Sequence, residues 1–409
     1  MTSQKTKEKK QFWIVLTIVF LGFLGISIPY LIFPALFLNP DFSIIPADWS
    51  NSSRLLLLGV TLAAYPLGQF FGSPILGSLS DDYGRKPLIV CSLIVTAFCN
   101  LLTGFAIAWQ YLGWLIFSRF LAGLMEGNIA IARAMAIDMT SISKHHTLGK
   151  INAAASIAFL VGPLLGGLLT EKAFFEELNP STPFYFICIF LFGLAGVSAL
   201  ILEKSKIILS SEARSFWKRI NLVGRLSELL SNKRLRFLMI ISTSFTLAVD
   251  IFYEFGPVYL TIKWGLSPAQ LVVYNGLLCL ALALGNGWLP NFISSRFPLR
   301  TTIISSITAL ALFLGVIVLA EAPWLMMVLF ALSGCAIGLA VTLITVKISN
   351  SVSDKIQGEV MGVQISLRVL GDALICLFGG ALLLLSSKLI LIIAAGIAFF
   401  TAAYYLYQK

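Results

Sequence analysis

The stretch Gly77-Ser-Leu-Ser-Asp-Asp-Tyr-Gly-Arg-Lys86 decides the fold, because it is a charged segment between two apolar stretches that are each long enough to cross a lipid bilayer. A helix needs about 20 apolar residues to cross the hydrocarbon layer. Glycines and charges at such a break indicate a turn outside the membrane. The sequence therefore predicts a hairpin of two membrane helices joined by a short polar turn, in which Gly77 and Gly84 allow close helix approach and a tight turn.

The rest of the chain has the composition of a membrane protein. Of its 409 residues, 58% are hydrophobic and 12% are charged, with a mean hydropathy of +0.91, whereas soluble domains carry about 25% charged residues. Long apolar runs in lipid are read as helices, because every backbone polar group there needs a partner within its own segment. We predict an all-α integral membrane protein with twelve spans, at residues 12–37, 53–78, 87–109, 111–138, 149–170, 183–203, 235–260, 268–292, 300–320, 324–349, 358–383 and 387–407.

Lys and Arg fix the predicted orientation, because they gather in the cytoplasmic segments of membrane proteins. With the N-terminus inside, few of the 29 Lys and Arg residues fall on the outer side: Arg54, Lys172, Lys263 and Lys388. Both termini are therefore predicted to be cytoplasmic. The net charge of +10 is a signal of topology and does not indicate nucleic-acid binding. Short tails and an absence of sorting motifs favour a bacterial inner (plasma) membrane.

One long polar stretch divides the chain into two halves of six spans each. Residues 204–234 form a basic linker, predicted to be cytoplasmic, between an N-terminal six-helix bundle at 1–203 and a C-terminal six-helix bundle at 235–409. Within it, residues 213–230 place apolar side chains at near-helical spacing among basic ones. This spacing predicts an amphipathic helix on the inner leaflet.

Glycine pairs indicate that the two halves are related units. Gly123-x-x-x-Gly127 in the fourth span is echoed by Gly334-x-x-x-Gly338 in the tenth. Internal repeats of this kind are typical of transporter folds.

The pattern Gly-x-Leu-x-Asp-x-x-Gly-Arg-Lys, carried by Gly77, Asp81, Gly84, Arg85 and Lys86, resembles the loop between helices 2 and 3 of the major facilitator superfamily of solute transporters. The resemblance implies the major facilitator fold, with 12 transmembrane helices in two six-helix pseudo-repeats. It also implies that the Asp81 carboxylate caps a helix of the opposite half and latches the cytoplasmic side in the outward-open state.

The expected recipient of that carboxylate is the start of the eleventh span, near Gly358. Asp82 departs from the family pattern, which usually has a basic residue there. The alternative is a turn whose charges only anchor the topology.

The fifth span carries a second resemblance. Its small residues resemble the antiporter motif of the drug/proton antiporters, the 12-helix, tetracycline-efflux-like group: Gly149, Gly162, Pro163, Gly166 and Gly167. The resemblance implies efflux. The alternative is that these residues only let helices pack closely, as small residues do in membranes.

The fourth span carries charges at helical spacing. Leu115-x-x-x-Arg119-x-x-Ala122-Gly123 resembles a family motif whose Arg is associated with proton transfer, and Arg119, Glu126, Arg133 and Asp138 follow one another at steps of seven, seven and five residues. Each charge at mid-membrane costs about 2.5–3.5 kcal/mol, so such a stripe is expected to face a watery cavity or charged partners. For Arg133 and Asp138 the alternative is snorkelling to the interface.

The second half has two further pairs of charges. Asp250 and Glu254 lie four residues apart in the seventh span, and two carboxylates on one helix face repel, so at least one is expected to hold a proton as a coupling site requires. The alternative is that they pair with a basic group of the other half, such as Arg119. Arg368 and Asp372 in the eleventh span are also four apart and are expected to pair along their own helix.

A central cavity is expected between the halves, where the resembling family lines its pathway with spans 1, 4, 7 and 10. Beyond the charged candidates, its predicted lining is Tyr30, Phe33, Asn128 and Tyr253. Aromatic and acidic groups suit a cationic or amphipathic organic solute, whereas Arg119 would accommodate an anion.

We therefore predict a secondary active transporter that moves a small organic solute by alternating access, as proton-coupled efflux. Its expected partners are the solute, protons and the lipid bilayer, without nucleic acid, and we expect a monomer driven by the proton gradient. The six cysteines and two histidines show no metal-ligand spacing, so no metal, no cofactor and no catalytic residues are expected. The alternatives are a proton-coupled importer of a nutrient or siderophore and, more remotely, an integral-membrane transferase or a sensor.

Overall fold

The computed structural model describes residues 2–46, 48–137, 144–170, 177–203, 231–294, 296–351 and 357–408, and the regular structure in these ranges is helical throughout. Eleven helical segments are long and apolar enough to cross a membrane, and a shorter apolar helix, Ala153–Leu168, occupies the place of the predicted fifth span. The predicted all-α membrane fold is confirmed.

The chain divides into two compact units. Unit 1 comprises Met1–Leu36, Phe42–Ala47 and Ala64–Asn221, and unit 2 comprises Phe37–Asp41, Asp48–Ala63 and Leu222–Lys409. The predicted linker lies outside the described residues as far as 230, and so does its amphipathic segment. The boundaries proposed for the two bundles and the linker stay predictions.

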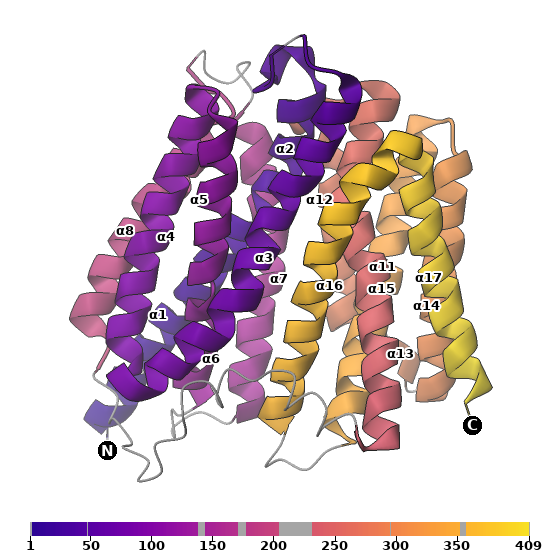
Figure 1. The fold of residues 1–409 in the computed structure, drawn as a ribbon. Coiled ribbons are helices and arrows are strands. Elements are labelled where there is room, and N and C mark those ends of the chain that lie inside the picture. The colour runs from indigo at the N-terminus through magenta and orange to yellow at the C-terminus, as the bar shows by residue number, and fades with distance from the viewer. Residues whose placement is uncertain are drawn as a thin grey trace. The chain divides into compact units, whose positions relative to one another are not determined.

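Unit 1 is built on helices that pack in neighbouring pairs (Figure 1). Its helices are α1 (Thr2–Ser27), α2 (Pro29–Leu38), α4 (Arg85–Ala108), α5 (Leu112–Met125), α6 (Gly127–Ile137), α7 (Lys144–Leu168) and α8 (Thr182–Ile201), together with the second half of α3 (Asn51–Tyr83). Helix α4 packs against α8 and α5, and α1 packs against α7.

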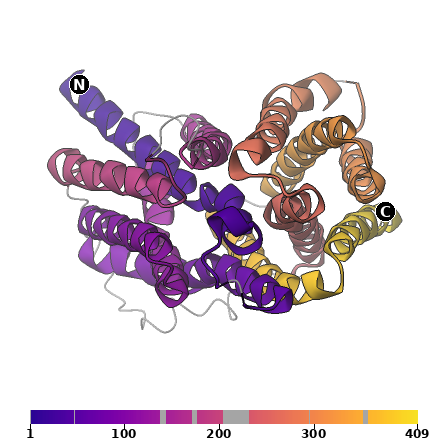
Figure 2. The same ribbon diagram turned by 90° about the horizontal axis from the view of Figure 1, so that it is seen from above.

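Unit 2 has its own set of packed helices, seen nearly end-on in Figure 2 in salmon to yellow. They are α11 (Lys233–Trp264), α12 (Pro268–Gly287), α13 (Leu289–Ser294), α14 (Leu299–Leu319), α15 (Pro323–Ser349), α16 (Gln357–Leu385) and α17 (Ser387–Tyr407), together with the first half of α3. Helix α12 packs against α15, α14 against α17, and α11 against both α16 and α17.

Local sequence explains where α11 and α12 begin and end. The Asn232 side chain caps α11 by accepting from the backbone N–H groups of Arg234 and Leu235, and Gly265 ends it in the left-handed conformation with φ +64°. Ser267 and Gln270 form a capping box at the start of α12.

The polar turn is shorter than the sequence predicts. Helix α3 continues to Tyr83 and α4 begins at Arg85, so the turn consists of Gly84 alone, with φ +89° and ψ 153°. This conformation explains why a glycine stands there. None of the described atoms lies within 4 Å of the place that a Gly77 Cβ would take, so the close approach expected at Gly77 stays a prediction.

Two predicted single spans are broken. The first span divides at Ile28 because α2 begins with Pro29, whose ring cannot continue the preceding helix. The fourth span divides at Glu126, where the backbone N–H of Glu126 donates to the carbonyl of Gly123 at 3.0 Å in a tight turn. A stretch expected to be one straight stripe of charges therefore bends at its central acid.

Gly123 in unit 1 and Gly334 in unit 2 both lie where a neighbouring helix comes close to the backbone. A Cβ at Gly123 of α5 would collide with the Tyr65 carbonyl of α3, and a Cβ at Gly334 of α15 would collide with the Leu278 carbonyl of α12. Close backbone contact between membrane helices depends on such small residues. The same device thus joins α3 to α5 in unit 1 and α12 to α15 in unit 2.

Candidate functional site

Three polar side chains of unit 1 meet in the apolar interior, and we call Tyr65, Arg119 and Glu126 the Tyr65 cluster. Arg119 and Glu126 are each 2% exposed. The Tyr65 hydroxyl donates a hydrogen bond to Glu126 Oε2, and the Arg119 guanidinium carbon lies 4.6 Å from the centroid of the Tyr65 ring. Tyr65 therefore contacts both the Glu126 carboxylate, through its hydroxyl, and the Arg119 guanidinium, through its ring.

Two buried oxygen atoms in or next to the Tyr65 cluster can accept a proton or a hydrogen bond. Glu126 Oε1 is buried and has no hydrogen-bond partner among the described residues, and the same holds for Asn128 Oδ1 two residues on. A buried acceptor without a donor costs about 1–3 kcal/mol. A proton, a water molecule or a donor group of a solute would remove that cost.

The predicted aromatic residues of unit 1 lie close to this cluster or on its flank. The Phe33 ring is buried, with its centroid 6.0 Å from the guanidinium carbon of Arg119. Tyr30 stacks on Phe159 of α7, with centroids 6.4 Å apart. Arg133 lies over the ring of Phe23 at 5.8 Å, and Asp138 lies outside the described residues.

In unit 2, Asp250 is paired with Arg368. The Arg368 side chain on α16 donates from Nη2 to Asp250 Oδ1 at 2.9 Å and from Nε to Oδ2 at 3.1 Å. The sequence predicted that Arg368 would pair with Asp372 four residues along its own helix. The structure instead directs the guanidinium across to α11, where Asp250 is buried with 3% exposure.

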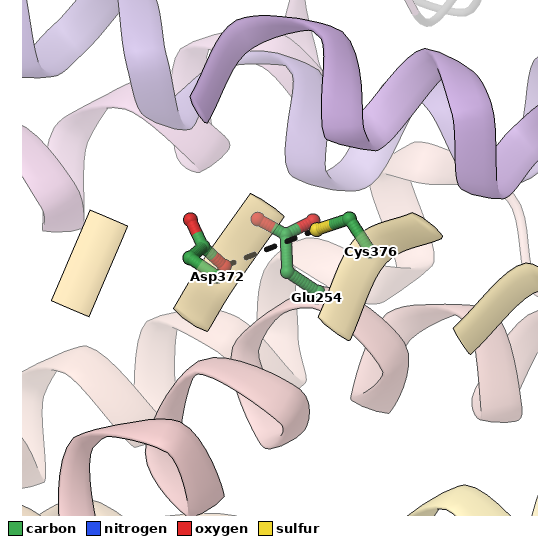
Figure 3. Close-up of side chains that lie close together, drawn as sticks. All are labelled: Glu254, Asp372 and Cys376. Atoms are coloured by element: carbon green, nitrogen blue, oxygen red, sulfur yellow. Dashed lines mark hydrogen bonds between the residues drawn. The ribbon is translucent and has the colours of Figure 1, made fainter. Parts of the chain in front are cut away.

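A second group of acids lies beside this pair. Glu254 of α11 and Asp372 and Cys376 of α16 point toward one another in Figure 3, and their ligand atoms all lie within 4.8 Å of one another. The Cys376 thiol lies 3.9 Å from Asp372 Oδ1. We call these three residues the Glu254 cluster. Tyr253 is the neighbour of Glu254 in α11 and is half-buried.

The Glu254 cluster has the donor types that a proton or a divalent cation would use. Two carboxylates this close repel when both are ionised, so a shared proton stabilises the pair. Carboxylate oxygens and a thiolate are also zinc ligands. The sequence predicted no metal, and that absence stays a prediction.

The small residues of the fifth span pack against α1. A Cβ at Gly166 would lie 2.8 Å from the Ile28 carbonyl oxygen, and one at Gly162 would lie 3.1 Å from the Leu24 carbonyl oxygen. Pro163 lies inside α7, as does Gly167. The contacts of Gly162 and Gly166 are those of helix packing, at the place where α1 ends.

The structure describes only some of the residues that the sequence motifs single out. Arg85 and Lys86 open α4. The side chain of Asp81 and the surroundings of Gly149 and Gly358 lie outside the described residues. The predicted contact between Asp81 and the eleventh span stays a prediction.

Sequence reasoning missed Tyr65 and Cys376. Tyr65 is a tyrosine in the middle of an apolar span, and a buried tyrosine hydroxyl usually finds a hydrogen-bond partner, so this position could have been singled out. Cys376 is one of the six cysteines in which the sequence shows no metal-ligand spacing. It follows Asp372 by four residues on one helix, which places the two on the same face.

Comparisons with known proteins match the chain to one family. The family model described as Major Facilitator Superfamily matches residues 15–375. The tetracycline resistance protein, class B, of Escherichia coli is 35% identical over 130 residues, which are 31% of this chain and 30% of that protein. Multidrug resistance protein 2 of Bacillus subtilis is 30% identical over 207 residues, 50% of this chain and 47% of that protein. The matched stretches thus span less than half the length of these relatives.

Solved structures share the fold over nearly the whole chain. The crystal structure of the human organic anion transporter MFSD10 superimposes with a TM-score of 0.70 at 16% identity, and covers 97% of this chain and 99% of that one. At this identity the likeness concerns the fold alone.

Proposed function

Because the chain belongs to the Major Facilitator Superfamily, we propose that it is a secondary active transporter that exports a small organic solute by alternating access, in exchange for protons. The direction is supported by the resistance and multidrug proteins to which parts of the chain are similar. No enzymatic step is part of this proposal.

The Glu254 cluster is the observation that carries proton coupling. The Asp250 carboxylate is paired with Arg368 at 2.9 Å, and we propose that the neighbouring acids of the Glu254 cluster exchange the proton. Glu254 and Asp372 lie together in the same unit, close enough for the charge of one to oppose the ionisation of the other. A proton held between them would leave when a conformational change opens the site to water on the inner side.

Proton exchange supplies the driving force. One proton that enters against an electrically neutral solute gains about 2.3 kcal/mol per 100 mV of membrane potential, to which the pH gradient adds. No bound cofactor is needed for such a cycle.

The Tyr65 cluster is our candidate for solute recognition. Glu126 offers an acceptor oxygen to a cationic or hydrogen-bond-donating group, and the rings of Tyr65 and Phe33 offer apolar and π surface. We also propose that the protein is a monomer in a bacterial inner membrane. The distribution of Lys and Arg supports the proposed location of both termini in the cytoplasm.

The experiment is proton flux in liposomes that contain purified protein and a trapped pH dye. Lipophilic cations, organic anions and siderophores are added one class at a time. We expect one class to drive proton movement opposite to its own, and we expect Glu254→Gln and Asp372→Asn to abolish that movement. Glu177→Gln is the matched control, because it removes one carboxylate charge at an exposed loop position.

The outcomes separate the alternatives. Proton movement in the same direction as the solute would identify an importer and overturn efflux. Solute movement without any pH change, equal in wild type and both variants, would identify a uniporter and overturn coupling at the Glu254 cluster.

A further inference from the structure

A basic pocket lies beside the C-terminal residues of unit 2, and it plays no part in the proposed transport cycle. Figure 1 marks the C-terminus. Its volume is about 590 Å³. Five cationic side chains line it: Lys233, Arg234, Arg236, Arg300 and Lys347. The described lining contains no aspartate or glutamate, so the charge of the pocket is not balanced from within. We call it the basic pocket.

The residues that line the basic pocket come from four helices, α11, α14, α15 and α17. Lys233, Arg234 and Arg236 come from the first turn of α11 and are exposed. Arg300 stands at the start of α14 and Lys347 at the end of α15. The convergence of separate helix ends distinguishes this site from a run of cations along one surface helix.

Two of the cations are held in place by bonds to α17 and to Gln408, the residue that follows it. Arg300 donates from Nη2 to the carbonyl oxygens of Leu406 at 2.9 Å and Gln408 at 2.6 Å. Lys347 donates to the Tyr405 hydroxyl and lies 4.8 Å from the centroid of its ring. Side chains that are already ordered lose less entropy when they bind a ligand.

The basic pocket also has an apolar side. Phe237 stacks on Tyr405 with ring centroids 5.6 Å apart, and Ile240 lies one helical turn along α11 with 41% exposure. The sequence predicts that this end of the helices lies at the cytoplasmic membrane surface, where anionic phospholipids present phosphate groups above their chains. A lining with cations at one end and apolar groups at the other suits such a molecule.

We propose that the basic pocket binds a phosphate-bearing anion, for which the headgroup of an anionic phospholipid is the favoured source. Phosphate oxygens accept charge-assisted hydrogen bonds from Arg and Lys, and these are about twice as strong as neutral ones. A bound headgroup would join the ends of α11, α14, α15 and α17, and would stabilise unit 2.

The test measures binding to the full-length protein in two arms. In the first arm, a fluorescent phosphatidylglycerol is titrated into protein in neutral nanodiscs of phosphatidylcholine. In the second arm, water-soluble glycerol 1-phosphate is titrated into the same sample. The pocket variant carries Arg234→Gln and Arg236→Gln, and the matched control carries Lys9→Gln and Lys10→Gln, two exposed cations on the same predicted side of the membrane.

We expect wild type and control to bind phosphatidylglycerol alike, because Lys9 and Lys10 do not line the basic pocket. We expect the pocket variant, which loses two of the five lining cations, to bind it about tenfold or more weakly, which corresponds to about 1.4 kcal/mol or more. Pocket-dependent binding in the first arm alone assigns the site to lipid, and pocket-dependent binding in both arms assigns it to soluble phosphate esters as well. Equal affinities for the pocket variant and the control in both arms would overturn the proposal. The melting temperature of each variant without ligand reports whether it is folded.

Discussion

Arg368 of α16 donates two hydrogen bonds to Asp250 of α11, from Nη2 to one carboxylate oxygen at 2.9 Å and from Nε to the other at 3.1 Å. The two side chains are unequally buried, since 46% of the Arg368 side chain is exposed whereas the Asp250 side chain is buried. The bond therefore satisfies a carboxylate that has little access to water, and it ties α11 to α16 beside the Glu254 cluster.

Arg368→Gln is expected to destabilise the protein, whereas the double variant Arg368→Gln with Asp250→Asn is expected to recover most of the loss. Removing one partner of a buried pair costs about 3–5 kcal/mol, because the other charge stays buried without a counter-charge. The half-exposed Arg368 places the expected loss below that range. Thermal unfolding in detergent measures it, and a double variant as unstable as Arg368→Gln would show that Asp250 does not depend on this pair.

Tyr65→Phe is expected to weaken solute recognition while the protein stays folded. The change removes the donor to Glu126 Oε2 and keeps the ring that faces Arg119. Without this bond the Glu126 carboxylate is no longer held in place for the solute, and we expect the affinity to fall about tenfold, which corresponds to about 1.4 kcal/mol. Solute binding by tryptophan fluorescence measures this, with the exposed Tyr111→Phe as the control.

Either of two results would contradict that assignment. Unchanged affinity in Tyr65→Phe would remove the Tyr65 cluster from solute recognition. An equal loss in Tyr111→Phe would show that the effect is not specific to the cluster.

The helices of this fold could be predicted from hydropathy because lipid permits few alternatives to a helix. Twelve apolar runs sufficed, although the breaks at Ile28 and Glu126 did not follow from them. Pro29 explains the first break after the fact. At the second, Gly127 and Asn128 are poor helix formers, and Gly costs about 1 kcal/mol relative to alanine inside a helix.

The partners of the buried charges could not be predicted from spacing along one helix. Arg368 and Asp372 have the right separation for an intrahelical pair, yet Arg368 reaches Asp250, 118 positions earlier in the chain. Which helices become neighbours is set by packing, such as the glycine contacts that join α12 to α15. Spacing identified the charged residues, and the tertiary fold paired them.

Gly84→Ala is expected to destabilise the hairpin of α3 and α4. With φ +89° and ψ 153°, Gly84 occupies a region that is essentially restricted to glycine, and a side chain there costs about 1–3 kcal/mol. Gly77→Ala is the matched control, since Gly77 lies inside α3 with no described atom near its missing Cβ. Alanine there is expected to leave the melting temperature unchanged or to raise it. A lower melting temperature in Gly77→Ala but not in Gly84→Ala would contradict the one-residue turn.

Gly59→Ala is expected to impair both stability and transport, because it forces apart two helices of unit 2. A Cβ at Gly59 of α3 would lie 2.7 Å from the Cα of Gly380 and 2.8 Å from the carbonyl oxygen of Cys376, both in α16. These atoms belong to backbone and cannot rotate away, so α16 itself has to move. Cys376 belongs to the Glu254 cluster, and we therefore expect Gly59→Ala to lower proton flux more than its loss of stability explains. Gly396→Ala in α17 is the matched control, since no described atom lies within 4 Å of its missing Cβ. Equal proton flux from the two variants, measured in liposomes with matched amounts of folded protein, would separate the α3–α16 contact from coupling.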